Sequence, residues 1–238
     1  MYNYQLYLII LGLILTIIAF RQSLFGIYLR IYYGSYHQKY LNYFDKDSYF
    51  QAAYYSKGEL SNQISNMKNV IRENDHFHVD QNVQFQGVNF GISTNDLVAL
   101  KGKPVSSDIL KIGDISVISL EYNIQDNNVI DKNIFYFYND EYYFGEYIFN
   151  KIEGETHTII SDAINIKYGS HFCDEDQFVI SNAQKNTLLY LDYGFRISVG
   201  YFNENSKQVH QLIQHQKYTR KKNKDIYVYE VNIQEIRF

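Results

Sequence analysis

"NIFYFYNDEYYFGEYIFN", residues 133–150, is the stretch that decides the fold, because two strand-like runs surround one turn signal. Both runs are rich in Ile, Phe and Tyr, which favour extended structure. Asn139 and Asp140 separate the runs, and these two residue types tolerate the backbone geometry of tight turns. The stretch therefore predicts a β-hairpin.

Strand-like and helix-like stretches alternate on both sides of this hairpin. Further strands are predicted near 115–124, 176–181, 186–192, 195–202 and 225–236, and helices over 155–169 and within 204–216. This set predicts an α+β fold with a mainly antiparallel sheet and packed helices. A helix, a glycine and several strands follow one another twice, which suggests two related halves, 76–150 and 151–238.

A longer helix is predicted before the sheet. Ser56 and Glu59 have the spacing of a capping box, which predicts a helix beginning near Ser56. Apolar residues then recur at helical intervals, and the helix is expected to end near residues 72–76. These apolar residues are Leu60, Ile64, Met67 and Ile71.

The N-terminal segment predicts a membrane anchor. No charged side chain precedes Arg21, and 6–20 is almost wholly apolar. Twenty helical residues span roughly 30 Å, the thickness of a bilayer's hydrocarbon core. We therefore expect a transmembrane helix over 1–21, a juxtamembrane helical region over 22–75 and a globular domain over 76–238. A cleavable signal peptide and a buried core helix are the alternatives.

Tyrosines recur every four residues after this segment, at Tyr28, Tyr32, Tyr36 and Tyr40. On a helix they would form one stripe. The stripe is either an interaction surface at the membrane or a face that packs against the globular domain, and Gly34 with Ser35 is expected to interrupt its helix.

"GISTNDLVALKGKP", residues 91–104, contains a Gly-Lys pair but not a phosphate-binding loop. Such a loop needs a glycine five residues before the pair and Ser or Thr after it, where this chain has Leu97 and Pro104. The stretch instead predicts a short helix capped by Ser93 and Asp96, with Leu97, Val98 and Leu100 buried and Gly102 at its exit.

The same stretch resembles the SmpA/OmlA (BamE-like) module of bacterial envelope proteins over residues 85–149. The residues that carry the resemblance are Gly91, Ile92, Ser93, Asp96, Leu97, Leu100, Gly102 and Pro104, followed by the hairpin. It implies non-enzymatic support of envelope assembly and a periplasmic domain. The chain lacks that family's lipoprotein cysteine, and the basic residues after the anchor instead favour a cytoplasmic domain.

Metal binding is an alternative function for which the sequence offers specific candidate ligands. On a strand, His76, His78 and Asp80 of "DHFHVD" would share one face, and a His-x-His pair can bind a transition metal. Spacing indicates no further ligand, although His171, Cys173 and Asp174 are available. No catalytic nucleophile motif is present.

These observations together predict a non-enzymatic, single-pass, membrane-anchored binding protein, an envelope scaffold or assembly factor. Its expected partners are the bilayer, through 1–21, and another membrane or envelope protein. No cofactor or nucleotide is expected, and a net charge of −4 argues against nucleic acid. The alternatives are a metal-dependent hydrolase using His76 and His78, and a membrane-tethered immunity-type protein.

Overall fold

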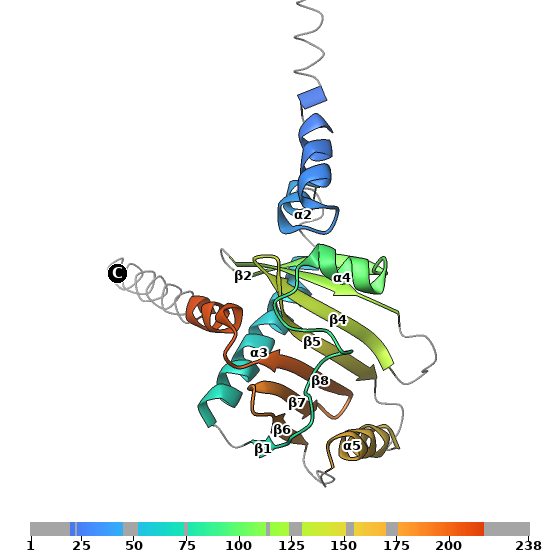
Figure 1. Ribbon diagram of the computed structural model, residues 1–238, viewed down its shortest axis with the longest axis vertical. Helices are drawn as coiled ribbons and strands as arrows, with labels where there is room; N and C mark the ends of the chain where they lie inside the picture. Colours follow the sequence, from blue (N-terminus) through green and yellow to red (C-terminus); the bar gives the residue numbers. More distant parts are fainter. Residues whose placement is uncertain are drawn as a thin grey trace, which may run out of the picture. The chain divides into compact units, whose positions relative to one another are not determined.

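The computed structural model describes residues 20–21, 23–44, 52–73, 76–112, 115–123, 130–150, 155–169 and 176–216. The chain divides into two compact units, Met1–Tyr49 and Phe50–Phe238. In the first unit, residues 23–33 are helical and α2 spans Gln38–Phe44. The second unit holds the sheet and all the other described helices (Figure 1).

One eight-stranded sheet organises the second unit, in the order β1-β6-β7-β8-β5-β4-β3-β2. Its strands are β1 (Phe77–His78), β2 (Ser106–Ile112), β3 (Ile115–Glu121), β4 (Ile130–Tyr138), β5 (Glu141–Asn150), β6 (Gln177–Ser181), β7 (Asn186–Asp192) and β8 (Arg196–Asn203). Every neighbouring pair is antiparallel except β1 and β6. The predicted α+β fold with a mainly antiparallel sheet is therefore confirmed.

The β4–β5 hairpin forms where the sequence predicts it. Asn139 and Asp140 both have positive φ, 54° and 63°, as a two-residue hairpin turn requires. The pairing shifts register between Tyr136 and Phe137, so Tyr143 is the extra residue of a bulge in β5. The bulge lets Tyr143 and Phe144 both enter the same core cluster.

Each face of the sheet has its own cover. On one face, α3 (Ala52–Glu73) and the helical residues 207–216 contribute to a core that contains Phe144 and Phe202 of the central strands (Figure 1). On the other face, Phe85 packs against Phe135, Tyr147 and Tyr201, with ring centroids 4.7, 4.6 and 5.5 Å apart. Helix α5 (Glu155–Tyr168) covers that second face beside the Phe85 segment.

Helix α3 begins at Ala52, about one turn earlier than the capping-box spacing predicts, and ends at Glu73 as expected. Ser56 therefore lies inside the helix, since the preceding Ala52 and Ala53 are strong helix formers. The predicted apolar face is confirmed, because Leu60, Ile64 and Met67 are buried. Since this face packs in the core of the sheet, α3 belongs to the same compact unit as the strands rather than to a separate juxtamembrane region.

Helix α4 (Thr94–Lys101) has the predicted capping box. Ser93 Oγ accepts from the Asp96 backbone N–H at 3.1 Å, and Gly102 leaves the helix at φ 85°. Leu97 is buried, but Leu100 is 66% exposed, so its predicted burial is wrong. The helix is only two turns long, and Leu100 lies on the side that faces solvent.

Helix α5 forms within the predicted range, 155–169, with Ile160 and Ile164 buried and Gly169 at its exit. Ile159 and Ile166 of the same helix are exposed, at 52% and 85%. The sequence did not predict β2 as a strand. The predicted final strand, 225–236, lies outside the described residues.

The two halves of the sheet are arranged alike. Strands β2 to β5 form one antiparallel meander after α4, and β6 to β8 form a second after α5. The last strands of the two meanders, β5 and β8, pair at the centre. Their relatedness stays a prediction, although the similar order of elements supports it.

Within the described ranges, no helix combines the length and apolar character needed to cross a membrane. The predicted anchor, 1–21, falls outside those ranges except for Phe20 and Arg21. The transmembrane helix therefore stays a prediction.

Candidate functional site: a polar cavity between α3 and the sheet

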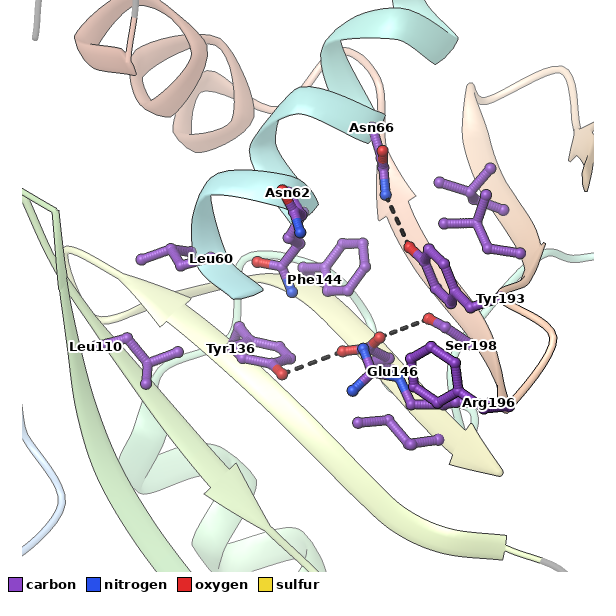
Figure 2. Close-up of a pocket in the computed structure, with 16 residues that line it drawn as sticks. Leu60, Asn62, Asn66, Leu110, Tyr136, Phe144, Glu146, Tyr193, Arg196 and Ser198 are labelled. Atoms are coloured by element: carbon purple, nitrogen blue, oxygen red, sulfur yellow. Dashed lines mark hydrogen bonds between the residues drawn. The ribbon is translucent and has the colours of Figure 1, made fainter. Parts of the chain in front are cut away.

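A cavity of about 210 Å³ lies between α3 and the central strands, and we call it the α3 cavity. Its floor is formed by β4, β5 and β8, its wall by α3, and its mouth by the turn between β7 and β8 (Figure 2). Apolar side chains line part of it, including Leu60, Phe144 and Leu189. Polar side chains converge on the rest.

Glu146 is the central polar group of the floor. It is 9% exposed and lies on β5, in the middle of the sheet. Tyr136 Oη donates to Glu146 Oε2 at 3.1 Å, and Ser198 Oγ donates to Oε1 at 2.5 Å (Figure 2). A buried carboxylate is costly without such donors, so the two hydroxyl groups hold it in place.

Arg196 lines the same cavity from the start of β8, which brings one acidic and one basic side chain into a confined space. The guanidinium Cζ lies 5.7 Å from the ring centroid of Tyr193, within the range of a cation–π contact. The cavity therefore offers groups that can recognise either charge, in surroundings where electrostatic interactions are stronger than in water.

Gly200 shapes the floor opposite Glu146, with which it is paired across β5 and β8. A Cβ at Gly200 would lie 2.6 Å from Phe144 Cζ, closer than side chains tolerate. The missing side chain therefore lets the tip of the Phe144 ring approach the backbone of β8.

Amide side chains of α3 form the wall. Tyr143 Oη donates to Gln63 Oε1 at 3.0 Å, and Asn66 Nδ2 donates to Tyr193 Oη at 3.3 Å. Burial, and secondarily the charge of Glu146, raises the pKa of Tyr143 well above its ordinary value, so its phenol stays a donor. Asn62 lies on the exposed side of this wall.

Two aromatic side chains stand at the mouth, where Tyr193 is 43% exposed and Phe195 76% exposed. Gly194 between them has φ 82°, and its N–H donates to Asp192 Oδ1 at 2.7 Å. This tight turn holds both rings beside a polar cavity. Exposed aromatic groups of this kind commonly anchor protein partners.

Two of the three predicted metal ligands, His76 and His78, lie beside other polar groups. His76 Nε2 lies 3.0 Å from the Val70 carbonyl oxygen, and its Nδ1 lies 3.2 Å from Glu204 Oε1 without completing a hydrogen bond of good geometry. His78 Nδ1 lies 3.2 Å from Ser181 Oγ, and Asp80 is exposed.

The two imidazole centroids are 6.5 Å apart. Glu204 also accepts a 2.5 Å hydrogen bond from Thr187 Oγ1, so His76 belongs to a buried polar cluster. In the part of the chain that the structure describes, no three His, Cys, Asp or Glu side chains are placed to hold a metal ion. His171, Cys173 and Asp174 fall outside that part.

The tyrosine stripe is split, as the sequence predicts. Tyr28 and Tyr32 stack on one helix with centroids 5.8 Å apart, and both are exposed. Gly34, at φ 92°, ends that helix, so Tyr36 and Tyr40 follow on a separate segment where both are partly buried. Whether the stripe contacts a partner stays a prediction.

Sequence reasoning missed the α3 cavity. The available signal was Glu146 itself, because Phe144 and Ile148 at alternate positions show that this side of the strand is buried. An acidic residue in such a series is unusual. Nothing in the sequence indicated that Arg196 and Tyr193 would lie beside it.

Fold and site together define an α+β protein with a polar cavity under one helix. Comparison of the chain with protein-family models, with curated proteins and with solved structures finds no match. The resemblance to the SmpA/OmlA module therefore stays a prediction.

Proposed function

We propose that this protein is a membrane-anchored, non-enzymatic binding protein that receives a side chain of a partner protein in the α3 cavity. The cavity volume of about 210 Å³ is the observation that carries this proposal. Small-molecule and cofactor sites usually have about 300–1,000 Å³, so this space fits one large side chain better. The exposed Tyr193 and Phe195 would pack around the entering residue.

The inserted side chain is expected to be polar. Glu146 and Arg196 offer an acceptor and a donor, and the amides of α3 offer both. A partner residue that matched these groups would gain specificity, because a residue of the wrong charge or shape would be repelled or would not fit.

We further propose that the partner is a membrane or envelope protein and that the chain acts as a bacterial scaffold or assembly factor. The support is the sequence of 1–21, which has the length and composition of a single-pass anchor. Retention in membranes through high-salt and carbonate washes tests the anchor, and release by either wash would contradict it.

Two locations of the domain follow from the sequence. The basic residues after the anchor favour the cytoplasm, and the family resemblance favours the periplasm. Reporter fusions at the C-terminus decide between them, because one reporter active only in the cytoplasm and one active only outside it give opposite results.

Site-specific photo-crosslinking tests binding at the cavity. A photoreactive phenylalanine analogue at Phe195 is expected to give one discrete protein adduct, while the same analogue at the exposed Val105 gives none. Asn62→Trp, which fills the cavity entrance, should abolish the adduct. Asn69→Trp, an exposed α3 position away from the cavity, should leave it unchanged. Equal adducts in both Trp variants would refute the site.

The sequence-based alternatives lead to different measurements. A hydrolase that used His76 and His78 would bind a transition metal, and His78→Ala would remove it. An immunity-type protein would bind its partner through the same cavity, so identifying the crosslinked partner distinguishes it from a scaffold.

A further inference from the structure

A second concave site lies on the opposite face of the sheet, between α5 and the central strands β5 and β8. It has a volume of about 310 Å³, and we call it the α5 groove. Tyr147 and Tyr201 form its sheet side, and Ile160 and Ile164 form its helix side. Neither the predicted binding function nor the α3 cavity involves this site.

The groove has one charged lining residue, Lys167, near the C-terminal end of α5. Its Nζ lies 5.0 Å from the Tyr168 ring centroid and 5.9 Å from that of Tyr201. Burial lowers the pKa of Lys167, and no charged partner offsets that effect. Among the residues that the structure describes, no carboxylate lies within ion-pairing distance of this ammonium group.

Two phenol groups lie next to the ammonium. Tyr168 is 2% exposed, and burial raises its pKa to about 12, so it keeps its proton. Its hydroxyl is near enough to Tyr201 for each phenol to affect the other's pKa, but completes no hydrogen bond of good geometry. This hydroxyl is itself covered from solvent, so Lys167 is the polar group of this end of the groove that a ligand can reach.

We propose that the α5 groove binds a single-chain fatty acid, with its carboxylate at Lys167 and its chain along Ile160 and Ile164. Charge complementarity selects an anionic head, and the otherwise apolar and aromatic lining selects an apolar body. If each methylene group needs roughly the 30 Å³ of a water molecule, the volume holds about ten carbons.

A helix of a partner protein is the competing occupant, because the exposed Ile166 extends the apolar surface of the groove along α5. A helix would need the whole exposed side of α5, whereas a fatty acid needs only the groove. Substitutions inside and outside the groove therefore separate the two.

The test uses the full chain in lipid nanodiscs and a ten-carbon fatty acid that carries a diazirine near its methyl end. Irradiation followed by peptide mapping is expected to place the label on α5 and on β5 or β8. Unlabelled decanoate should compete about tenfold better than decanol, since decanol lacks the charge that meets the ammonium.

Matched variants locate the site. Ala163 lines the groove, so Ala163→Trp should abolish labelling, while Ile166→Trp, on the same helix but outside the groove, should preserve it. Lys167→Met should weaken labelling about tenfold. Lys103→Met, at an exposed site elsewhere, should not change it.

Three results would overturn the proposal. Label that spreads over the surface or maps to the α3 cavity contradicts the site. Equal competition by decanol contradicts the anionic head. Equal loss of label in the Ala163→Trp and Ile166→Trp variants shows that labelling does not depend on the groove. If Ala163→Trp unfolds by circular dichroism, Lys167→Met and the decanol comparison still decide.

Discussion

Gly145→Ala is expected to destabilise the second unit by about 2–3 kcal/mol, because it forces a methyl group into a filled aromatic core. A Cβ at Gly145 would lie 2.3 Å from Phe85 Cδ1 and 2.4 Å from Tyr142 Oη. Favourable contacts between such atoms are about 3.5–4.0 Å long, so each falls short by more than about 1 Å.

The rings cannot easily move away. Phe85 is fully buried and lies between Phe135, Tyr147 and Tyr201, while Tyr142 is 1% exposed. The estimate therefore lies at the upper end of the cost of overpacking. If only the backbone mattered, Gly145→Ala would raise the free energy of unfolding. Gly145 lacks a positive φ, and Gly→Ala at such a relaxed position stabilises a protein by about 0.4–1 kcal/mol.

Urea unfolding of the full chain in non-ionic detergent, followed by circular dichroism, measures the effect. In a thermal scan the same loss lowers Tm by roughly 4–12 °C. Phe85→Leu should partly rescue Gly145→Ala, with the double variant at least about 1 kcal/mol more stable than additivity predicts. An unchanged or higher stability for Gly145→Ala would refute the close packing.

Gly102→Ala is the control. Gly102 has φ 85° with no atom within 4 Å of a built Cβ, so its cost of about 1 kcal/mol comes from the backbone. Phe85→Leu should not rescue it. Rescue at both positions would show that Phe85→Leu acts through something other than the contact with Gly145.

Three further predictions concern the turn, the cap and the buried tyrosines. Asp140→Ala should cost about 1–3 kcal/mol in urea unfolding, because Asp140 Oδ1 accepts from buried Thr94 Oγ1 at 2.6 Å, while Asp140→Asn should cost less. Ser93→Ala should cost about 1 kcal/mol through loss of the α4 cap, and Ser93→Thr should retain most of that stability. Burial raises the pKa of Tyr168 to about 12 and that of Tyr201 well above 10.0, so the folded state keeps protons that the unfolded state loses. Stability should therefore fall as pH rises above about 10, and phenolate absorbance should rise together with unfolding; full ionisation of the tyrosines in a still-folded protein would contradict this.

Local signals in the sequence predicted most of the elements. The Asn139-Asp140 turn and the Ser93 capping box each depend on a few neighbouring residues, and both have the predicted conformation. Local patterns were less successful where the partner is distant. Strand β2 is an edge strand whose register depends on β3, and Leu100 has an apolar side chain that no other element covers.

The candidate sites depend almost wholly on tertiary structure. Glu146 and Ser198 lie 52 residues apart, and Gln63 and Tyr143 lie 80 apart, so no short-range pattern could relate them. The sheet order brings β5 beside β8, and that pairing aligns Glu146 with Gly200 on one face and places Tyr147 and Tyr201 on the other.

The sequence by itself determined the class of fold, the hairpin and the capping of α4, because capping, turn geometry and apolar periodicity act over a few residues. Only the tertiary structure decided which side chains meet. His76, whose spacing from His78 suggested a metal site, lies in a buried polar cluster. Glu146 and Lys167, which sequence reasoning did not single out, are the central charged groups of the two sites. The physical reason is that burial and electrostatic partners are set by strand order and helix packing, which involve residues far apart in the chain.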